Sequence, residues 1–148
     1  YYTALSSRPG QAIMAPLLTA WVPQRAIDTT LDFVFAPQAA PDGYADYLGP
    51  RLSLRRDTLR ENALQRAHLL DEISAQVVHY PELTLPVEIV HGTADTIVPA
   101  HVHSEPLSRQ IPSASLTLLD GIGHMPQHAA EAEVIAAIER AAARAGLR

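Results

Sequence analysis

The sequence predicts an α/β fold in which a helical region precedes a small parallel sheet and the helices that pack on it. Two short apolar runs, residues 87–91 and 116–119, have the length and composition of buried strands. The segment between them, residues 100–111, has the composition of a short helix, although Pro106 disturbs its first turns. Because strand, helix and strand in this order form a right-handed crossover, we expect the two strands to be parallel neighbours.

Residues 1–80 contain the pattern of a helical region that ends before the sheet begins. Residues 13–22 are almost all apolar, but prolines interrupt them and they are too short to span a membrane, so we expect a helix there that is buried or lines a groove. A second helix is expected over residues 24–35. One or two helical turns are expected over residues 44–48, between segments rich in glycine and proline.

The longest predicted helix begins at a capping box. Thr58 and Glu61 have the spacing at which a threonine oxygen and a glutamate each satisfy a free amide at a helix start. Apolar residues then recur every three or four positions as far as about Val78, and Pro81 ends the helix. A last helix is expected over residues 129–145, with glutamates early and arginines late, as the helix dipole favours.

The composition restricts the class of protein. Of the 148 residues, 47% are hydrophobic and 18% are charged, and all 11 basic residues are arginine. A net charge of −5 offers no basic surface for nucleic acid, and no apolar run is long enough to span a membrane. The absence of cysteine excludes disulfides, cysteine nucleophiles and zinc–thiolate sites. The chain begins at Tyr1 rather than methionine, so we expect the native amino terminus upstream, and we expect a cytoplasmic protein.

Asp95 and His124 are the candidate catalytic residues, because each follows the carboxyl end of a predicted strand. Such positions gather at one edge of a parallel sheet, so an acid and a base could meet there. Imidazole is a suitable general base near neutral pH, and a carboxylate can fix its tautomer. Taken singly, Asp95 could instead bond the amides of its own turn, and His124 could be a solvated surface histidine. Their paired placement favours the catalytic interpretation.

The residues around this pair resemble a known family. The stretch H-G-T-A-D-T-I-V-P, residues 91–99, and the stretch G-I-G-H-M-P, residues 121–126, are similar to the last two strand ends of the α/β-hydrolase superfamily. The resemblance covers about the last 65 residues. It implies that Asp95 is the triad acid and that His124 is the triad base. That family carries its nucleophile on a G-x-S-x-G turn, which does not occur in this sequence.

The resemblance therefore implies the carboxyl-terminal half of a larger hydrolase. Residues 1–80 would be its helical cap, and residues 81–148 the last two parallel strands with their helices. A nucleophile upstream of the chain would act on a small-molecule ester, without a cofactor, and the isolated chain would be inactive. The missing amino-terminal half, or a second copy of the chain, would cover the open sheet. The side chains expected to contact substrate are Trp21, Phe33, Phe35, Tyr44, Val98 and Met125. The aromatic ones among them could instead fill the core between the cap helices.

Two other functions stay open on the sequence. An aspartate nucleophile would instead open epoxides or cleave carbon–halogen bonds, and a chain with no upstream nucleophile would be a binding module on the same fold. A metal site built from His91, His101, His103 and Asp95 is disfavoured, because the spacing of His101 and His103 at a helix start points them apart. No metal is therefore expected.

Overall fold

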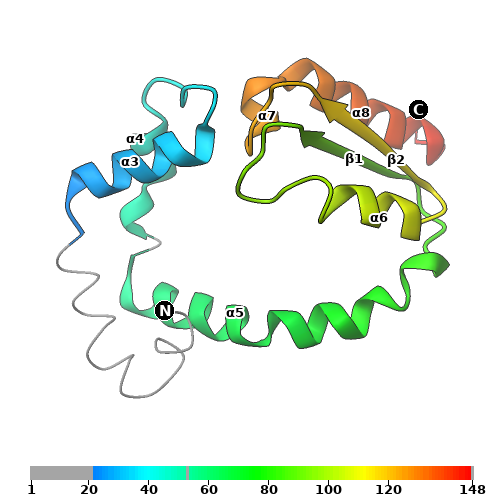
Figure 1. The fold of residues 1–148 in the computed structure, drawn as a ribbon, viewed down its shortest axis with the longest axis horizontal. Coiled ribbons are helices and arrows are strands. Elements are labelled where there is room, and N and C mark those ends of the chain that lie inside the picture. Colours follow the sequence, from blue (N-terminus) through cyan, green and yellow to red (C-terminus); the bar gives the residue numbers. More distant parts are fainter. Residues whose placement is uncertain (1–21, 53, 148) are drawn as a thin grey trace. The chain divides into compact units, whose positions relative to one another are not determined.

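A computed structural model describes residues 22–52 and 54–147 of the protein (Figure 1). These residues divide into two compact units. The described residues of the first unit are 22–30, 42–52 and 54–78, and those of the second are 31–41 and 79–147. The second unit is therefore built from two stretches that are far apart in the sequence.

The helices of the amino-terminal region lie close to their predicted ranges. Helix α3 covers Gln24–Phe35, α4 covers Tyr44–Leu48, a 3-10 turn η1 covers Pro50–Leu52, and α5 covers Arg56–Val77. Gly49 ends α4 in the left-handed conformation, with φ of 58°, where glycine has no Cβ to clash. The helix predicted over residues 13–22 lies outside the described residues, apart from Val22.

The predicted capping box at Thr58 is wrong. Helix α5 starts three residues earlier than the capping box predicts, with Arg55 as the residue before its first turn and no side chain capping its amides. The amide of Leu59 already donates to the carbonyl of Arg55, so Thr58 lies inside the first turn. Nothing between Arg55 and Thr58 interrupts a helix, and Asp57 supplies a negative charge that the helix dipole favours in the first turn.

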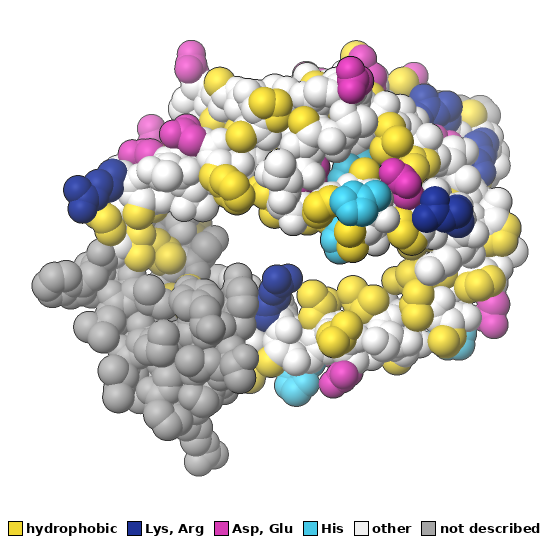
Figure 2. Space-filling model, in the orientation of Figure 1, with side chains coloured by type: hydrophobic (Ala, Val, Ile, Leu, Met, Phe, Trp, Pro, Cys, Tyr) yellow, Lys and Arg dark blue, Asp and Glu magenta, His cyan; other side chains and the backbone are white. Residues whose placement is uncertain are grey.

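The apolar stripe of α5 is buried only near its start. Leu59 and Ala63 are buried, whereas Leu70 is 76% exposed and Ile73 is 44% exposed. Figure 2 shows hydrophobic side chains on the surface of this helix. The periodicity predicted the helix correctly, but not how much of its apolar face would be covered.

The carboxyl-terminal unit contains the predicted parallel pair of strands. Strand β1 covers Val87–Gly92 and β2 covers Ala114–Leu119. They pair in parallel from Val87 opposite Ala114 to Gly92 opposite Leu119. The predicted α/β class and the parallel crossover are both confirmed. The two strands end at the same level, so the loops that follow them begin side by side.

Helices cover both sides of this pair. Helix α6 covers Ser104–Gln110, shorter than predicted, because residues 100–103 form turns and Pro106 falls in the first turn, where proline is tolerated. The end of the chain forms a short helix α7, Pro126–Ala129, and the longer α8, Glu131–Arg144. In Figure 1, α8 and α6 lie on opposite sides of the strands. A 3-10 turn η2, Tyr80–Glu82, precedes β1.

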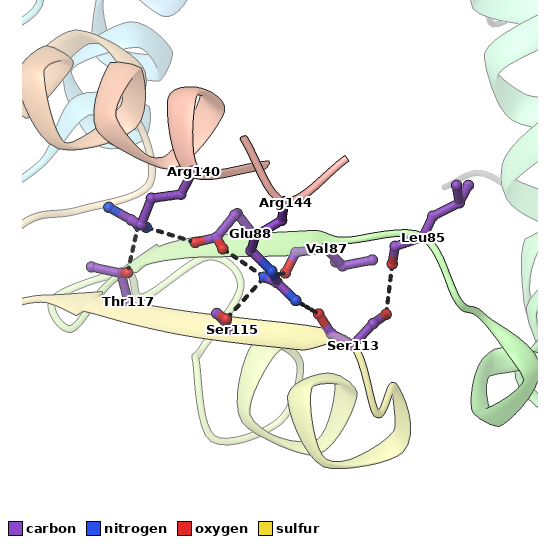
Figure 3. Close-up of polar contacts among 8 residues, drawn as sticks. All are labelled: Leu85, Val87, Glu88, Ser113, Ser115, Thr117, Arg140 and Arg144. Atoms are coloured by element: carbon purple, nitrogen blue, oxygen red, sulfur yellow. Dashed lines mark hydrogen bonds and ion pairs between the residues drawn. The ribbon is translucent and has the colours of Figure 1, made fainter. Parts of the chain in front are cut away.

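A buried carboxylate fastens α8 to the sheet (Figure 3). The side chain of Glu88 on β1 is only 5% exposed, and it accepts from Arg140 Nε at 3.0 Å and from Arg144 Nη1 at 2.7 Å. Arg140 also donates to Thr117 Oγ1 and Arg144 to Ser115 Oγ, both on β2. Burial raises the pKa of Glu88, but the hydrogen bonds and charges of the two arginines outweigh it and hold the pKa below its ordinary value.

Candidate active site

Asp95 lies in the turn that follows β1, and backbone amides of the same turn bond its carboxylate. Oδ1 accepts hydrogen bonds from the backbone amides of Ile97, at 2.8 Å, and Val98, at 2.9 Å. The residue is only 9% exposed. Burial raises the pKa of Asp95, but the hydrogen bonds from Val98, His124 and Ile97 outweigh it and hold the pKa below its ordinary value. Asp95 is therefore an ionised acceptor at neutral pH.

His124 meets this carboxylate across 29 positions of sequence. Its Nδ1 lies 2.9 Å from Asp95 Oδ2, so the contact expected from the two strand ends is present. Because an ionised carboxylate only accepts hydrogen bonds, Nδ1 carries the proton and the neutral ring keeps a lone pair on Nε2. The side chain is 32% exposed, whereas that of Asp95 is 5% exposed. The pair thus has a buried acid and a base that solvent can reach.

His91 is a third member of the cluster, to which the sequence analysis gave no part in catalysis. Its Nε2 lies 2.8 Å from the carbonyl oxygen of Val98 and 3.4 Å from Asp95 Oδ2. Both partners only accept, so Nε2 carries the proton and donates into the turn that holds Asp95. The side chain is 12% exposed. The sequence feature that could have pointed to His91 is its position at the end of β1, one residue before a glycine.

Two glycines let the loop before His124 pack closely against neighbouring backbone. A Cβ on Gly92 would lie 2.1 Å from the carbonyl oxygen of Ile122, and a Cβ on Gly123 would lie 2.0 Å from the carbonyl oxygen of Ala36. Real side chains do not come that close, so both positions require glycine for space. The amide of Ala94 donates to the carbonyl of Ile122 at 2.9 Å and joins the two loops.

Gln38 also contacts this loop, and nothing in the sequence pointed to it. Its Nε2 donates to the carbonyl of Gly121 at 2.8 Å, and its Oε1 accepts from the amide of Gly123 at 2.9 Å. Gln38 follows α3 in one of the segments rich in glycine and proline that flank residues 44–48, and residues 31–41 belong to the same compact unit as the sheet. The side chain therefore bridges two parts of one unit.

The residues expected to contact substrate occupy different environments. Phe35 is 2% exposed and its ring lies 5.6 Å from that of His128, so it is part of the core. Phe33 is 58% exposed. Met125 directly follows His124, and its Sδ accepts from Gln127 at 3.5 Å. Val98 serves the Asp95 turn through its backbone amide and carbonyl. Tyr44 begins α4 in the other unit, and Trp21 lies outside the described residues.

Within residues 22–52 and 54–147, no group of three or more histidine, cysteine, aspartate or glutamate side chains is placed to hold a metal ion. His91 and Asp95 lie close together, but His91 Nε2 contacts the Asp95 carboxylate and the carbonyl of Val98. None of the helices in the described part of the chain is long and apolar enough to cross a membrane.

Comparisons with solved structures give a partial likeness. No protein-family model matches the sequence, and no curated protein matches it either. Among solved structures, a candidate lipase from Acinetobacter baumannii AYE aligns with 23% sequence identity and a TM-score of 0.49. The alignment covers 81% of this chain and 40% of the lipase chain, so this chain spans less than half of that protein. Both similarity values are low, and by themselves they assign neither a fold nor an activity to this chain.

Proposed function

We propose that this chain carries the acid and the base of an α/β-hydrolase, and that the nucleophile lies upstream of it. The observation that supports this most directly is the contact between His124 Nδ1 and the buried, ionised Asp95, which leaves Nε2 of a partly exposed imidazole as the free acceptor. The proposed substrate is a small-molecule ester. Residues 1–80 are proposed as the cap of the fold, and residues 81–148 as the carboxyl-terminal part of its core.

In the proposed reaction, His124 moves a proton twice. Nε2 first takes the proton of a serine hydroxyl as that oxygen attacks the ester carbonyl, which gives a tetrahedral oxyanion and an imidazolium. The imidazolium then gives its proton to the departing alcohol as the carbon–oxygen bond breaks. Water attacks the acyl-enzyme in the same way, with His124 again accepting and returning the proton. Asp95 stays ionised throughout, holds the ring in one tautomer and stabilises its positive charge.

The surroundings of Asp95 suit this role. A carboxylate that accepts two backbone amides is fixed in orientation before the histidine arrives, so its second oxygen can fix the imidazole. His91 adds a third donor to the turn, and its Nε2 lies 3.4 Å from Oδ2 of the acid, whose side chain is 5% exposed. An acid shielded in this way interacts more strongly with a developing imidazolium than an acid in water would.

The proposal is tested on the purified protein expressed together with its upstream sequence. A fluorophosphonate probe, which modifies activated serines, should label one residue outside the 148-residue chain. His124→Ala should reduce the labelling rate by a factor of 100 or more, on the order expected for general-base catalysis. His101→Ala is the matched control, because His101 is an exposed histidine of the same unit that forms no hydrogen bond or ion pair with Asp95. The control should label at the wild-type rate.

Three results would contradict the proposal. Labelling that is insensitive to His124→Ala would remove the base from the mechanism. Labelling of the isolated 148-residue chain would place the nucleophile inside it. Failure to label, together with hydrolysis of an epoxide or a haloalkane that depends on His124, would replace the serine by an aspartate nucleophile.

A further inference from the structure

The carboxamide of Gln38 pairs with the backbone on either side of Ile122. It donates to the carbonyl of Gly121 and accepts from the amide of Gly123, at 2.8 Å and 2.9 Å. In a parallel sheet, one residue bonds its neighbouring strand in this way: it donates to the carbonyl of one residue and accepts from the amide of the residue two positions further on. Gln38 thus supplies, from a side chain, the pairing that a third strand would give to this short stretch.

Three other backbone groups of the stretch already have partners in the sheet region. The amide of Gly121 donates to Thr93 Oγ1 at 2.9 Å, and the carbonyl of Ile122 accepts from Ala94 at 2.9 Å. The amide of Ile122 donates to Leu119 at 3.3 Å. The carbonyl of Gly121 and the amide of Gly123 are the two groups for which Gln38 is the partner. Removing its carboxamide therefore leaves two backbone groups to find water, one of them on the buried Gly123.

The two hydrogen bonds of Gln38 matter because residues 121–123 lead directly into His124. Gly121 has φ of 69°, and two glycines within three residues give this loop more conformational freedom than other sequences would have. His124 follows directly, and its ring must hold Nδ1 against Asp95. A glycine-rich loop does not fix a following side chain by itself, so it depends on contacts from outside. Thr93 and Ala94 bond Gly121 and Ile122, and Gln38 is the side chain that bonds the amide of Gly123, directly before His124.

We infer that Gln38 is a positioning residue for His124: its carboxamide fixes the backbone of residues 121–123 and so holds the imidazole on Asp95. Gln38 touches neither substrate nor reacting atoms, and it acts only through the loop. The inference rests on the proposed function for the role of His124 as a base. The contact that Gln38 maintains can nevertheless be measured without any substrate.

The first test uses Gln38→Met, which keeps the length of the side chain and removes both hydrogen bonds. Gln110→Met is the control, because Gln110 is exposed at the end of α6 in the same unit. The signal is the Nδ1 proton of His124, observed by NMR with 15N-labelled histidine and assigned through its loss in His124→Ala. In the wild type we expect a strongly downfield, slowly exchanging proton. In Gln38→Met we expect its exchange to be at least tenfold faster, and in Gln110→Met we expect no change.

The second test measures hydrolysis of p-nitrophenyl acetate by the protein expressed with its upstream sequence. Misplacing a catalytic group by about 1 Å costs on the order of 100-fold, so Gln38→Met should lower kcat by 10- to 100-fold. KM should stay within about twofold of the wild type, because substrate binding does not involve this loop contact. A residue with only a structural role would lower stability in urea and leave both kcat and the proton signal of the folded protein unchanged.

The outcomes separate the two ideas. If the wild type shows the bonded proton and depends on His124 for activity, but Gln38→Met matches it in both measurements, the inference about Gln38 is wrong and the proposed function stands. If the wild type shows no bonded proton, both are wrong. If Gln38→Met does not fold, Gln38→Asn replaces it, because a shorter amide can keep one bond but not both. It should then give a smaller change of the same kind, and wild-type behaviour in that variant would also overturn the inference.

Discussion

Replacing Glu88 by glutamine removes a negative charge from the interior of the unit that holds the candidate site. Two guanidinium groups of α8 converge on this carboxylate, and the same two groups reach side chains of β2 (Figure 3). Glu88 therefore couples one helix to both strands. A glutamine has the same shape, so the substitution tests the charge rather than the packing.

The magnitude follows from the contacts. Each hydrogen bond between charged groups contributes about 1.5–3 kcal/mol, and the carboxylate accepts one from Arg140 and one from Arg144. The glutamine oxygen retains one weaker bond of about 1 kcal/mol, while its amino group faces a donor. The arginine side chains are 46% and 38% exposed, so water partly replaces what they lose. We expect the free energy of unfolding to fall by about 2–3 kcal/mol near neutral pH.

Urea unfolding followed by circular dichroism measures this loss. Glu133→Gln is the matched control: Glu133 is an exposed residue in the first turn of α8, where loss of charge costs about 0.5 kcal/mol through the helix dipole. The pKa of Glu88 is lowered in the folded protein, so its stabilisation is present above the ordinary value of 4.5 and is lost as the pH falls through the lower folded pKa. The difference between wild type and Glu88→Gln should shrink in that range. A loss no larger than that of the control, or one that stays constant in acid, would refute the reasoning.

Two further predictions concern the site itself. Gly123→Ala should lower the free energy of unfolding by about 3 kcal/mol, because the new Cβ meets the carbonyl oxygen of Ala36. Gly121 has no atom within 4 Å of a Cβ, so Gly121→Ala should lower the free energy of unfolding only by the cost of its positive φ, about 1 kcal/mol, in the same urea titration. A larger loss for Gly121→Ala than for Gly123→Ala would show that the close approach to Ala36 does not determine stability. Asp95→Asn should flatten the acid dependence of stability. The pKa of Asp95 is lowered, so its contribution is present above the ordinary value of 3.8 and is lost as the pH falls further, and equal slopes for variant and wild type below that value would contradict this.

The sequence predicted the strand pair and the meeting of Asp95 with His124, because both depend on local patterns. Each strand is a short apolar run that ends in glycine-containing turns, and parallel topology brings the two ends to one edge. The catalytic interpretation of the pair is still a proposal. The capping box failed for a different reason: Thr58 has the right spacing, but nothing upstream of it stops the helix.

Gln38 could not have been found by the same reasoning. A glutamine in a loop has no periodicity, and its partners lie 83 and 85 positions away. The hydrogen bonds of His91 also depend on which way its ring points after the turn has formed. Such contacts are set by tertiary packing, which a strand pattern does not specify.

The distance in sequence between Gln38 and Gly123 also affects the order in which the parts of this unit fold. Closing a loop of 85 residues costs more chain entropy than closing the 29-residue loop between Asp95 and His124, by about 1 kcal/mol if entropy grows with the logarithm of length. The parallel strand pair can therefore form first, from a continuous carboxyl-terminal stretch, and the acid–base contact is fixed once Gln38 has docked on the loop. During synthesis Gln38 must wait until Gly123 has left the ribosome before its carboxamide finds a partner, so docking of residues 31–41 completes this unit late.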